Sequence, residues 1–128
     1  MINQSDLEAF GYFDLFKNSP DSTLDILKEY SNWVESKMLT SGHERLIENT
    51  LGLVGESGEV AEKVKKLIRD KHKFTPEEIA SEIGDVIFYG TGLGMIFGFT
   101  LHDIIIMNMK KLNSRQERGV LQGSGDNR

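Results

Sequence analysis

The sequence predicts an all-α protein, a bundle of four helices with an extra short helix at the N-terminus. Apolar residues recur every three or four positions along most of the chain, and no stretch alternates as a half-buried strand would. Only two prolines, Pro20 and Pro76, interrupt these patterns. Four helical segments with short connections are typical of a helical bundle.

The N-terminal region contains the first two predicted helices. Ser5 and Glu8 have the spacing of a capping box, which predicts a short helix within an N-terminal extension, residues 1–18. The run NSPD at 18–21 then breaks the chain, because these residue types favour turns. A longer helix is expected from about Ser22 to Met38.

The longest predicted helix runs from about Glu44 to Asp70, after a turn at Ser41 and Gly42. The motif TPEE at 75–78 combines a capping threonine, a proline at the first helical position and a glutamate at the third. This motif predicts the start of the next helix, which is expected to end near Gly98.

The last predicted helix starts at Thr100, which has capping-box spacing to Asp103, and ends near Ser114. Residues 115–128 are polar and rich in glycine, so they are expected to form a flexible tail. Residues 19–114 are therefore expected to form the folded domain.

The composition is that of a globular domain of 128 residues, 38% hydrophobic and 27% charged. Cysteine is absent, which excludes disulfides and thiolate metal sites and fits a cytoplasmic location. Residues 1–10 lack the features of a signal peptide. The uncharged stretch 86–101 is shorter than the roughly 20 residues that span a bilayer, so no membrane partner is expected. A net charge of −5 argues against nucleic-acid binding through charge alone.

Two segments within the predicted helices share the pattern acid-x-Gly-acid-Val, and each places its two acids on one helix face. The four acids are Glu56, Glu59, Glu82 and Asp85. On helical wheels, both pairs lie at the same offset from an apolar arc, which for the first pair comprises Val60, Val64, Leu67 and Ile68. If the helices are antiparallel, the pairs converge, and such an oxygen-only cluster suits Mg²⁺ or Mn²⁺.

A second interpretation of these acids is that they are solvated groups at the edge of an apolar face, as in a non-catalytic helical interaction module. Two features favour a metal site. Beyond Asp85 the helix is apolar on nearly all sides, where unpaired charge is costly. Both motifs also keep a mid-helix glycine, which costs about 0.5–1 kcal/mol relative to alanine.

The kind of metal chemistry follows from the ligands. A ferritin-like di-iron site requires Glu-x-x-His, but Glu62 and Phe88 occupy the corresponding positions. Mg²⁺ usually contacts its substrate through phosphate oxygens. The residues therefore favour metal-assisted hydrolysis of a phosphoanhydride.

From about Leu24 to Arg118 the chain resembles the MazG-like, all-α nucleoside triphosphate pyrophosphohydrolases. The resemblance depends on the patterns GLVGESGEVAEKVKKL, EIGDVIFY and MNMKKLNSR. It implies a four-helix fold that assembles as a homodimer or homotetramer. It also implies hydrolysis of an NTP or dNTP between the α and β phosphates, with Mg²⁺ or Mn²⁺. Another phosphoanhydride, such as an alarmone or a nucleotide sugar, stays open as the substrate.

The resemblance also implies roles for individual residues. The metal ligands would be Glu56, Glu59, Glu82 and Asp85, and either Glu56 or Glu59 would accept the proton of the attacking water. Many members carry a second glutamate directly before the first of these acids, where this chain has Gly55, so the choice of base stays open. The residues implied as substrate contacts are Tyr89, Asn108, Lys111 and Arg115.

Overall fold

The computed structural model describes residues 22–71 and 73–124, and within these ranges it contains helices and no strand. The helices are α3 (Ser22–Lys37), α4 (Gly42–Arg69), α5 (Pro76–Ile96) and α6 (Leu101–Glu117). The prediction of an all-α fold with four main helices is therefore confirmed. The short helix expected within residues 1–18 lies outside the described residues.

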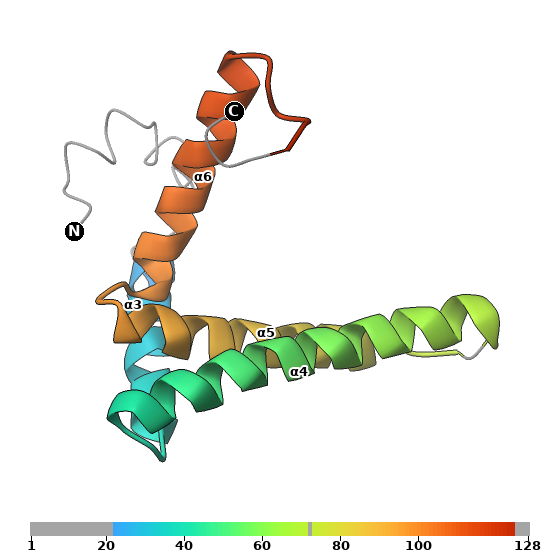
Figure 1. The fold of residues 1–128 in the computed structure, drawn as a ribbon, viewed down its shortest axis with the longest axis horizontal. Coiled ribbons are helices and arrows are strands. Elements are labelled where there is room, and N and C mark those ends of the chain that lie inside the picture. Colours follow the sequence, from blue (N-terminus) through green and yellow to red (C-terminus); the bar gives the residue numbers. More distant parts are fainter. Residues whose placement is uncertain (1–21, 72, 125–128) are drawn as a thin grey trace.

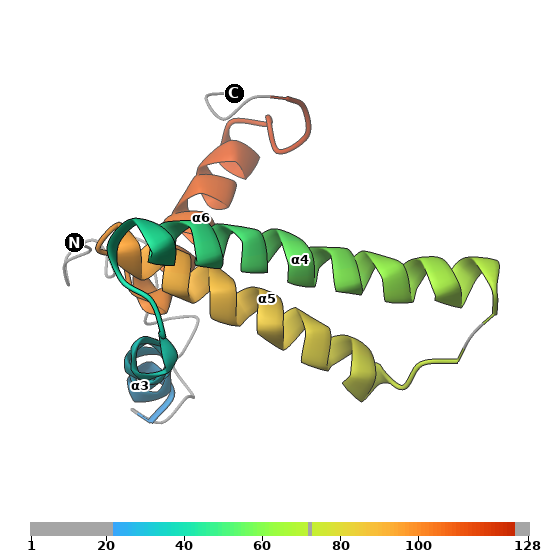
Figure 2. The same ribbon diagram turned by 60° about the horizontal axis from the view of Figure 1, so that its bottom comes forward.

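Helices α4 and α5 form a long antiparallel hairpin. Figures 1 and 2 show the two helices side by side, joined at one end by a short connection, with α3 and α6 at the other end. Helix α6 leaves the hairpin at a bend of 95° from α5. The four helices thus form an open arrangement within one chain, in which α6 contacts α3 and the end of α5.

The starts of α5 and α6 confirm the two predicted caps. The backbone N–H of Glu78 donates to the Thr75 hydroxyl at 3.2 Å, and the N–H of Thr75 donates to the Glu78 carboxylate at 2.8 Å. The same reciprocal pair joins Thr100 and Asp103. The N–H of Asp103 donates to the Thr100 hydroxyl at 3.2 Å, and the N–H of Thr100 donates to the Asp103 carboxylate at 3.0 Å. Such caps satisfy backbone donors that have no partner within the helix, which fixes where the helix begins.

The end of α6 differs from the expected end at Ser114. The helix continues to Glu117, and the N–H of Val120 then donates to the carbonyl of Arg115 at 2.8 Å. Residues 115–117, expected in the flexible tail, are therefore helical. The prediction ended too early because the polar side chains of these residues show no apolar periodicity, whereas the helix continues through backbone hydrogen bonds. The domain boundaries at 19 and 114 stay a prediction.

Helices α4 and α5 approach closely because α5 carries a glycine at their contact. A Cβ atom on Gly92 would lie 2.3 Å from Oδ1 of Asn49. Asn49 is buried on α4, and its Nδ2 donates to the carbonyl of Arg45 at 2.9 Å. Only a residue without a side chain leaves room for this amide.

Helices α3 and α6 are joined near the end of the hairpin that is opposite its tip. The buried Ser31 hydroxyl accepts a hydrogen bond from the N–H of Leu101 at 2.9 Å. The fully buried apolar side chains among the described residues are Val34 on α3 and Ile106 on α6. No single described helix is both long and apolar enough to cross a membrane, and α5 with α6 meets those criteria only as a bent pair.

Candidate metal centre

Three of the four predicted acids meet in the middle of the hairpin. Glu56 on α4 and Glu82 and Asp85 on α5 each offer one carboxylate oxygen, and these oxygens lie within 4.8 Å of one another. The first two side chains are half-buried and the third is exposed. Mg²⁺ binds oxygen ligands at about 2.1 Å, so its ligand oxygens lie about 3–4 Å apart. Small rotations of these side chains would therefore bring their oxygens to the spacing that one Mg²⁺ ion requires.

The electrostatics of the cluster also favour a cation. The pKa of Glu56 is raised above its ordinary value, first by partial desolvation and then by the charges of Asp85, Glu82 and Glu59. A carboxyl group surrounded by other carboxylates resists ionisation, and an added positive charge removes this penalty.

Glu59 is exposed and does not belong to the group of three oxygens. It lies three residues from Glu56 on α4, about 60° away around the helix, which directs it toward the rim of the site. Its charge still contributes to the raised pKa of Glu56. Its roles as a metal ligand and as a catalytic base stay predictions.

Two residues beside the cluster were not found by sequence reasoning. The Nζ atom of Lys63 on α4 lies 3.2 Å from Oε1 of Glu82. The pKa of Tyr30 on α3 is raised, first by burial and then by the charge of Asp85. A wheel could have revealed Lys63, because it follows Glu56 by seven positions and so lies about 20° from it. Tyr30 reaches the site through a tertiary contact, which leaves no local signal.

Tyr89 lies one turn beyond Asp85, where its ring packs against α4 at Gly52. A Cβ atom on Gly52 would lie only 2.4 Å from this ring, so the glycine makes the contact possible. Tyr89 also meets the Phe88 ring edge-on, with 5.3 Å between ring centroids. The ring lines a cavity of about 230 Å³ toward the α3–α4 turn, and substrate contact there stays a prediction.

Asn108 and Lys111 lie together on α6, away from the three carboxylates. They line a cavity of about 530 Å³ whose other described residues are Phe99, Ile104 and Met107. Helix α6 points away from the hairpin (Figures 1 and 2), so one chain does not bring these side chains to the cluster. Arg115 is buried on the same helix. Their roles as substrate contacts stay predictions.

Comparison with known proteins identifies the class of protein that carries these features. Residues 43–120 match the MazG nucleotide pyrophosphohydrolase domain. The chain is also 47% identical over 83 residues to the Gene 37 protein of Mycobacterium phage L5, across 62% of this chain and 73% of that protein. No solved structure matches significantly. The chain therefore belongs to the MazG nucleotide pyrophosphohydrolase domain family.

Family membership agrees with the geometry of the hairpin. It supports nucleotide pyrophosphohydrolase activity in general, and the family depends on divalent metal ions. The cluster of Glu56, Glu82 and Asp85 offers oxygen ligands of the type that such ions prefer.

Proposed function

We propose that this protein is a cytoplasmic, Mg²⁺-dependent nucleoside triphosphate pyrophosphohydrolase. Its substrate would be an NTP or a dNTP, cleaved between the α and β phosphates to a nucleoside monophosphate and pyrophosphate. The observation that carries the proposal is the convergence of Glu56, Glu82 and Asp85 in a chain of the MazG family. Mn²⁺ is the metal that would replace Mg²⁺ most readily at such ligands.

In this proposal, Glu56, Glu82 and Asp85 hold the metal. Bound Mg²⁺ would neutralise phosphate charge and lower the pKa of the attacking water. Exposed Glu59 at the rim and half-buried Glu56 are the two candidates to accept the proton of that water. Phosphoanhydride cleavage depends mainly on positioning and charge stabilisation, so the protein need not form a covalent bond.

We also propose that the protein assembles as a homodimer, or as a homotetramer built from two such dimers. Helix α4 carries a row of exposed apolar side chains on the side opposite Glu56, here named the α4 stripe; its members are Ile47, Leu51 and Val54. Their exposed fractions are 46% at Ile47, 66% at Leu51 and 67% at Val54. Their spacing is that of a helix–helix seam, and such rows usually mark an interface.

A second copy would also explain the position of the predicted substrate contacts. Asn108, Lys111 and Arg115 are carried by α6, which points away from its own hairpin. In an assembly, α6 of one copy can approach the hairpin of another. Tyr89 belongs to the hairpin itself and would contact the nucleotide from the same chain.

The test is product analysis across all NTPs and dNTPs. The protein is first stripped of metal with a chelator and is then assayed with added Mg²⁺. We expect nucleoside monophosphate and pyrophosphate from at least one nucleotide. Replacement of a residue that merely supports a metal ligand costs about 10- to 100-fold, so Glu82→Gln and Asp85→Asn should each cost about 100-fold or more. Glu62→Gln is the matched control, since Glu62 pairs with Lys65 and Lys66 on α4.

Other results of the same assay would distinguish the two alternative functions, hydrolysis of another phosphoanhydride and a non-catalytic interaction module. Hydrolysis of an alarmone or a nucleotide sugar, with all triphosphates left intact, would replace the proposed substrate. Absence of any hydrolysis, with a folded chain, would favour the helical interaction module. Equal activity in Asp85→Asn and wild type would show that the carboxylate cluster takes no part in the reaction.

A further inference from the structure

Lys63 lies against the carboxylate cluster and not in open solvent. Its Nζ atom is 3.2 Å from Oε1 of Glu82, and the two side chains are only 20% and 23% exposed. Among the ion pairs within residues 22–71 and 73–124, this one alone includes a member of the cluster. The site therefore contains one positive charge of its own.

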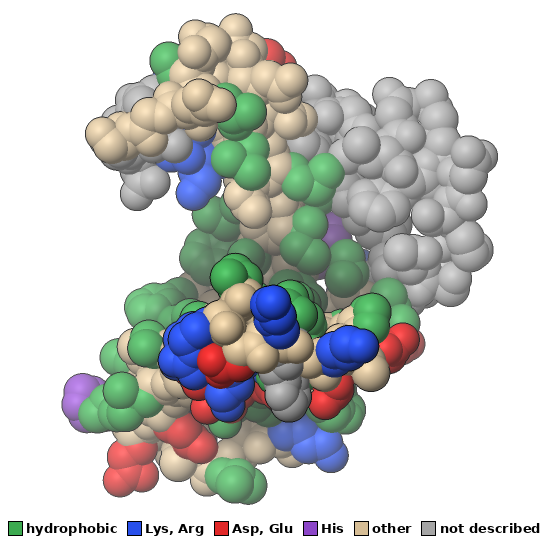
Figure 3. Space-filling view, turned by 90° about the vertical axis from the view of Figure 1, so that its right-hand side faces the viewer, with side chains coloured by type: hydrophobic (Ala, Val, Ile, Leu, Met, Phe, Trp, Pro, Cys, Tyr) green, Lys and Arg blue, Asp and Glu red, His purple; other side chains and the backbone are tan. Residues whose placement is uncertain are grey.

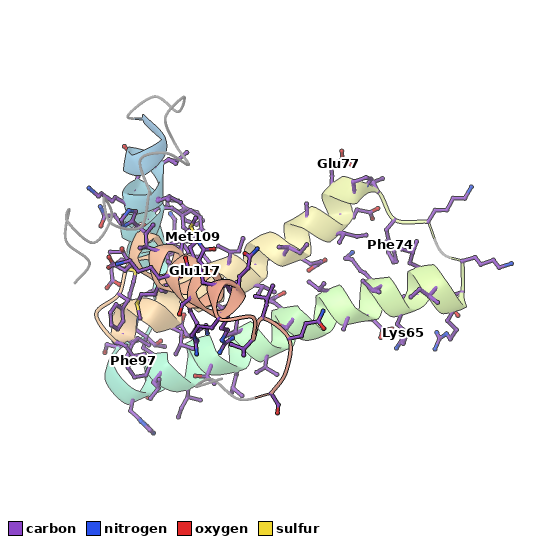
Figure 4. The ribbon with its side chains drawn as sticks, turned by 90° about the horizontal axis from the view of Figure 1, so that it is seen from above. Lys65, Phe74, Glu77, Phe97, Met109 and Glu117 are labelled. Atoms are coloured by element: carbon purple, nitrogen blue, oxygen red, sulfur yellow. The ribbon has the colours of Figure 1, made fainter. Side chains whose placement is uncertain are left out.

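Other lysines of α4 have partners elsewhere. Lys65 and Lys66 both pair with Glu62 on the same helix. Figure 4 shows Lys65 on the side of α4 that faces away from α5. At the tip of the hairpin, Figure 3 shows Lys and Arg side chains interspersed with acidic ones. These are ordinary surface pairs, and Lys63 differs from them in both burial and partner.

Phe74 holds the Lys63 side chain from a second direction. The Nζ atom lies 4.9 Å from the centroid of the Phe74 ring, within reach of a cation–π attraction. Phe74 belongs to the connection between α4 and α5, where Figure 4 places it at the tip end of the hairpin. Contacts from α5 and from this connection therefore keep the ammonium group at the edge of the cluster.

This position has opposite consequences for the metal-free and the metal-bound site. Without metal, the ammonium offsets repulsion among three carboxylates whose oxygens lie within 4.8 Å. A divalent cation at the same carboxylates would lie close to that ammonium, and like charges repel. The group that stabilises the empty cluster thus opposes the binding of the ion.

We propose that Lys63 is the resident counter-ion of the cluster and competes with a divalent metal for it. The inference rests on the proposed function, because it takes Glu56, Glu82 and Asp85 as metal ligands. Lys63 weakens the binding of the free ion. A metal ion that arrives with a triphosphate is disfavoured less, since the phosphate charge offsets the ammonium. The lysine therefore biases the site toward the metal–nucleotide complex.

Titration of the full-length protein with Mn²⁺, followed by electron paramagnetic resonance of the free ion, tests this without turnover. Lys63→Met keeps a long side chain against Phe74 and removes the charge, so we expect the Kd for Mn²⁺ to fall about tenfold or more. Lys63→Arg keeps the charge and should bind like wild type. Lys65→Met is the control on the side of α4 that faces away from α5, where screening should limit the change to about twofold.

Lys63→Gln serves as a second variant without the charge and must shift the Kd in the same direction. Thermal unfolding with and without Mn²⁺ should show a larger metal-dependent rise in Tm for Lys63→Met than for wild type. An unchanged or higher Kd for Mn²⁺ in both neutral variants overturns the proposal. If wild type binds Mn²⁺ in that case, the metal site of the proposed function still stands. If neither wild type nor Lys63→Met binds Mn²⁺, the metal site of the proposed function fails as well.

Discussion

Asn49 shows how a single polar side chain constrains the hairpin that carries the site. Its amide is buried between α4 and α5, and Oδ1 faces the bare Cα of Gly92 without a hydrogen-bond partner among the described residues. The packing therefore depends on glycine at position 92 for space, and not for backbone conformation.

We expect Gly92→Ala to destabilise the protein by about 1–3 kcal/mol, because the new methyl group would overlap the buried amide oxygen. Gly55→Ala is the matched control. A Cβ atom there meets nothing within 4 Å, so it should stabilise α4 by about 0.5–1 kcal/mol through helix propensity. Urea unfolding measures both. A neutral Gly92→Ala would mean that α4 and α5 can separate at this point without cost.

At the scale of elements, an ion pair joins α3 to the start of α4. The Arg45 guanidinium donates to both carboxylate oxygens of Glu35, one of them at 2.8 Å. This hydrogen bonding, together with the charge of Arg45, holds the pKa of Glu35 below its ordinary value. The pair spans the turn at residues 38–41 and links the end of α3 to the start of α4.

Because the Glu35 pKa is lower in the folded state, the pair stabilises the protein above the unfolded pKa, and its contribution is lost as pH falls through the folded pKa. Glu35→Gln should therefore cost about 0.5–1 kcal/mol at pH 7, and the difference from wild type should vanish in acid below the folded pKa. Unfolding free energies measured from pH 7 down to pH 3 would show this. A pH-independent cost for Glu35→Gln would contradict the assigned cause.

The helices could be predicted where their signals are local. Capping boxes depend on residues three positions apart, so the starts at Thr75 and Thr100 followed from the sequence. The facing of Glu56 toward α5 followed from helical periodicity in the same way. The end of α6 could not be predicted in this way. Residues 115–117 continue the helix through backbone hydrogen bonds, and their polar side chains form no apolar pattern that would indicate it.

At the scale of the whole molecule, the sequence could not reveal what covers each apolar face. The arc predicted beside the first acid pair is solvent-exposed toward its end, with Val64 at 40% and Leu67 at 44%. A helical wheel shows that a face is apolar, and only the tertiary arrangement shows its neighbour. The departure of α6 from the hairpin, which separates Lys111 from the carboxylates, is likewise set by long-range packing on α3.

The α4 stripe gives the prediction that belongs to the whole molecule. Leu51→Glu combined with Val54→Glu places two charges where the proposed second copy would pack. Both side chains are more than half exposed in the single chain, so each folded copy should tolerate the change. Burying two such side chains contributes about 3–6 kcal/mol, so the dimer Kd should rise about 100-fold or more.

Sedimentation velocity over a range of concentrations measures this shift, and Leu39→Glu is the control, since Leu39 is 91% exposed and lies outside the stripe. We expect wild type and Leu39→Glu to sediment as dimers or tetramers, and the double variant as a folded monomer. Wild type that stays monomeric at every concentration would remove the homodimer. A double variant that dimerises like wild type would move the interface to another face, and α6 would then be the next helix to test, because it carries the cavity with Asn108 and Lys111.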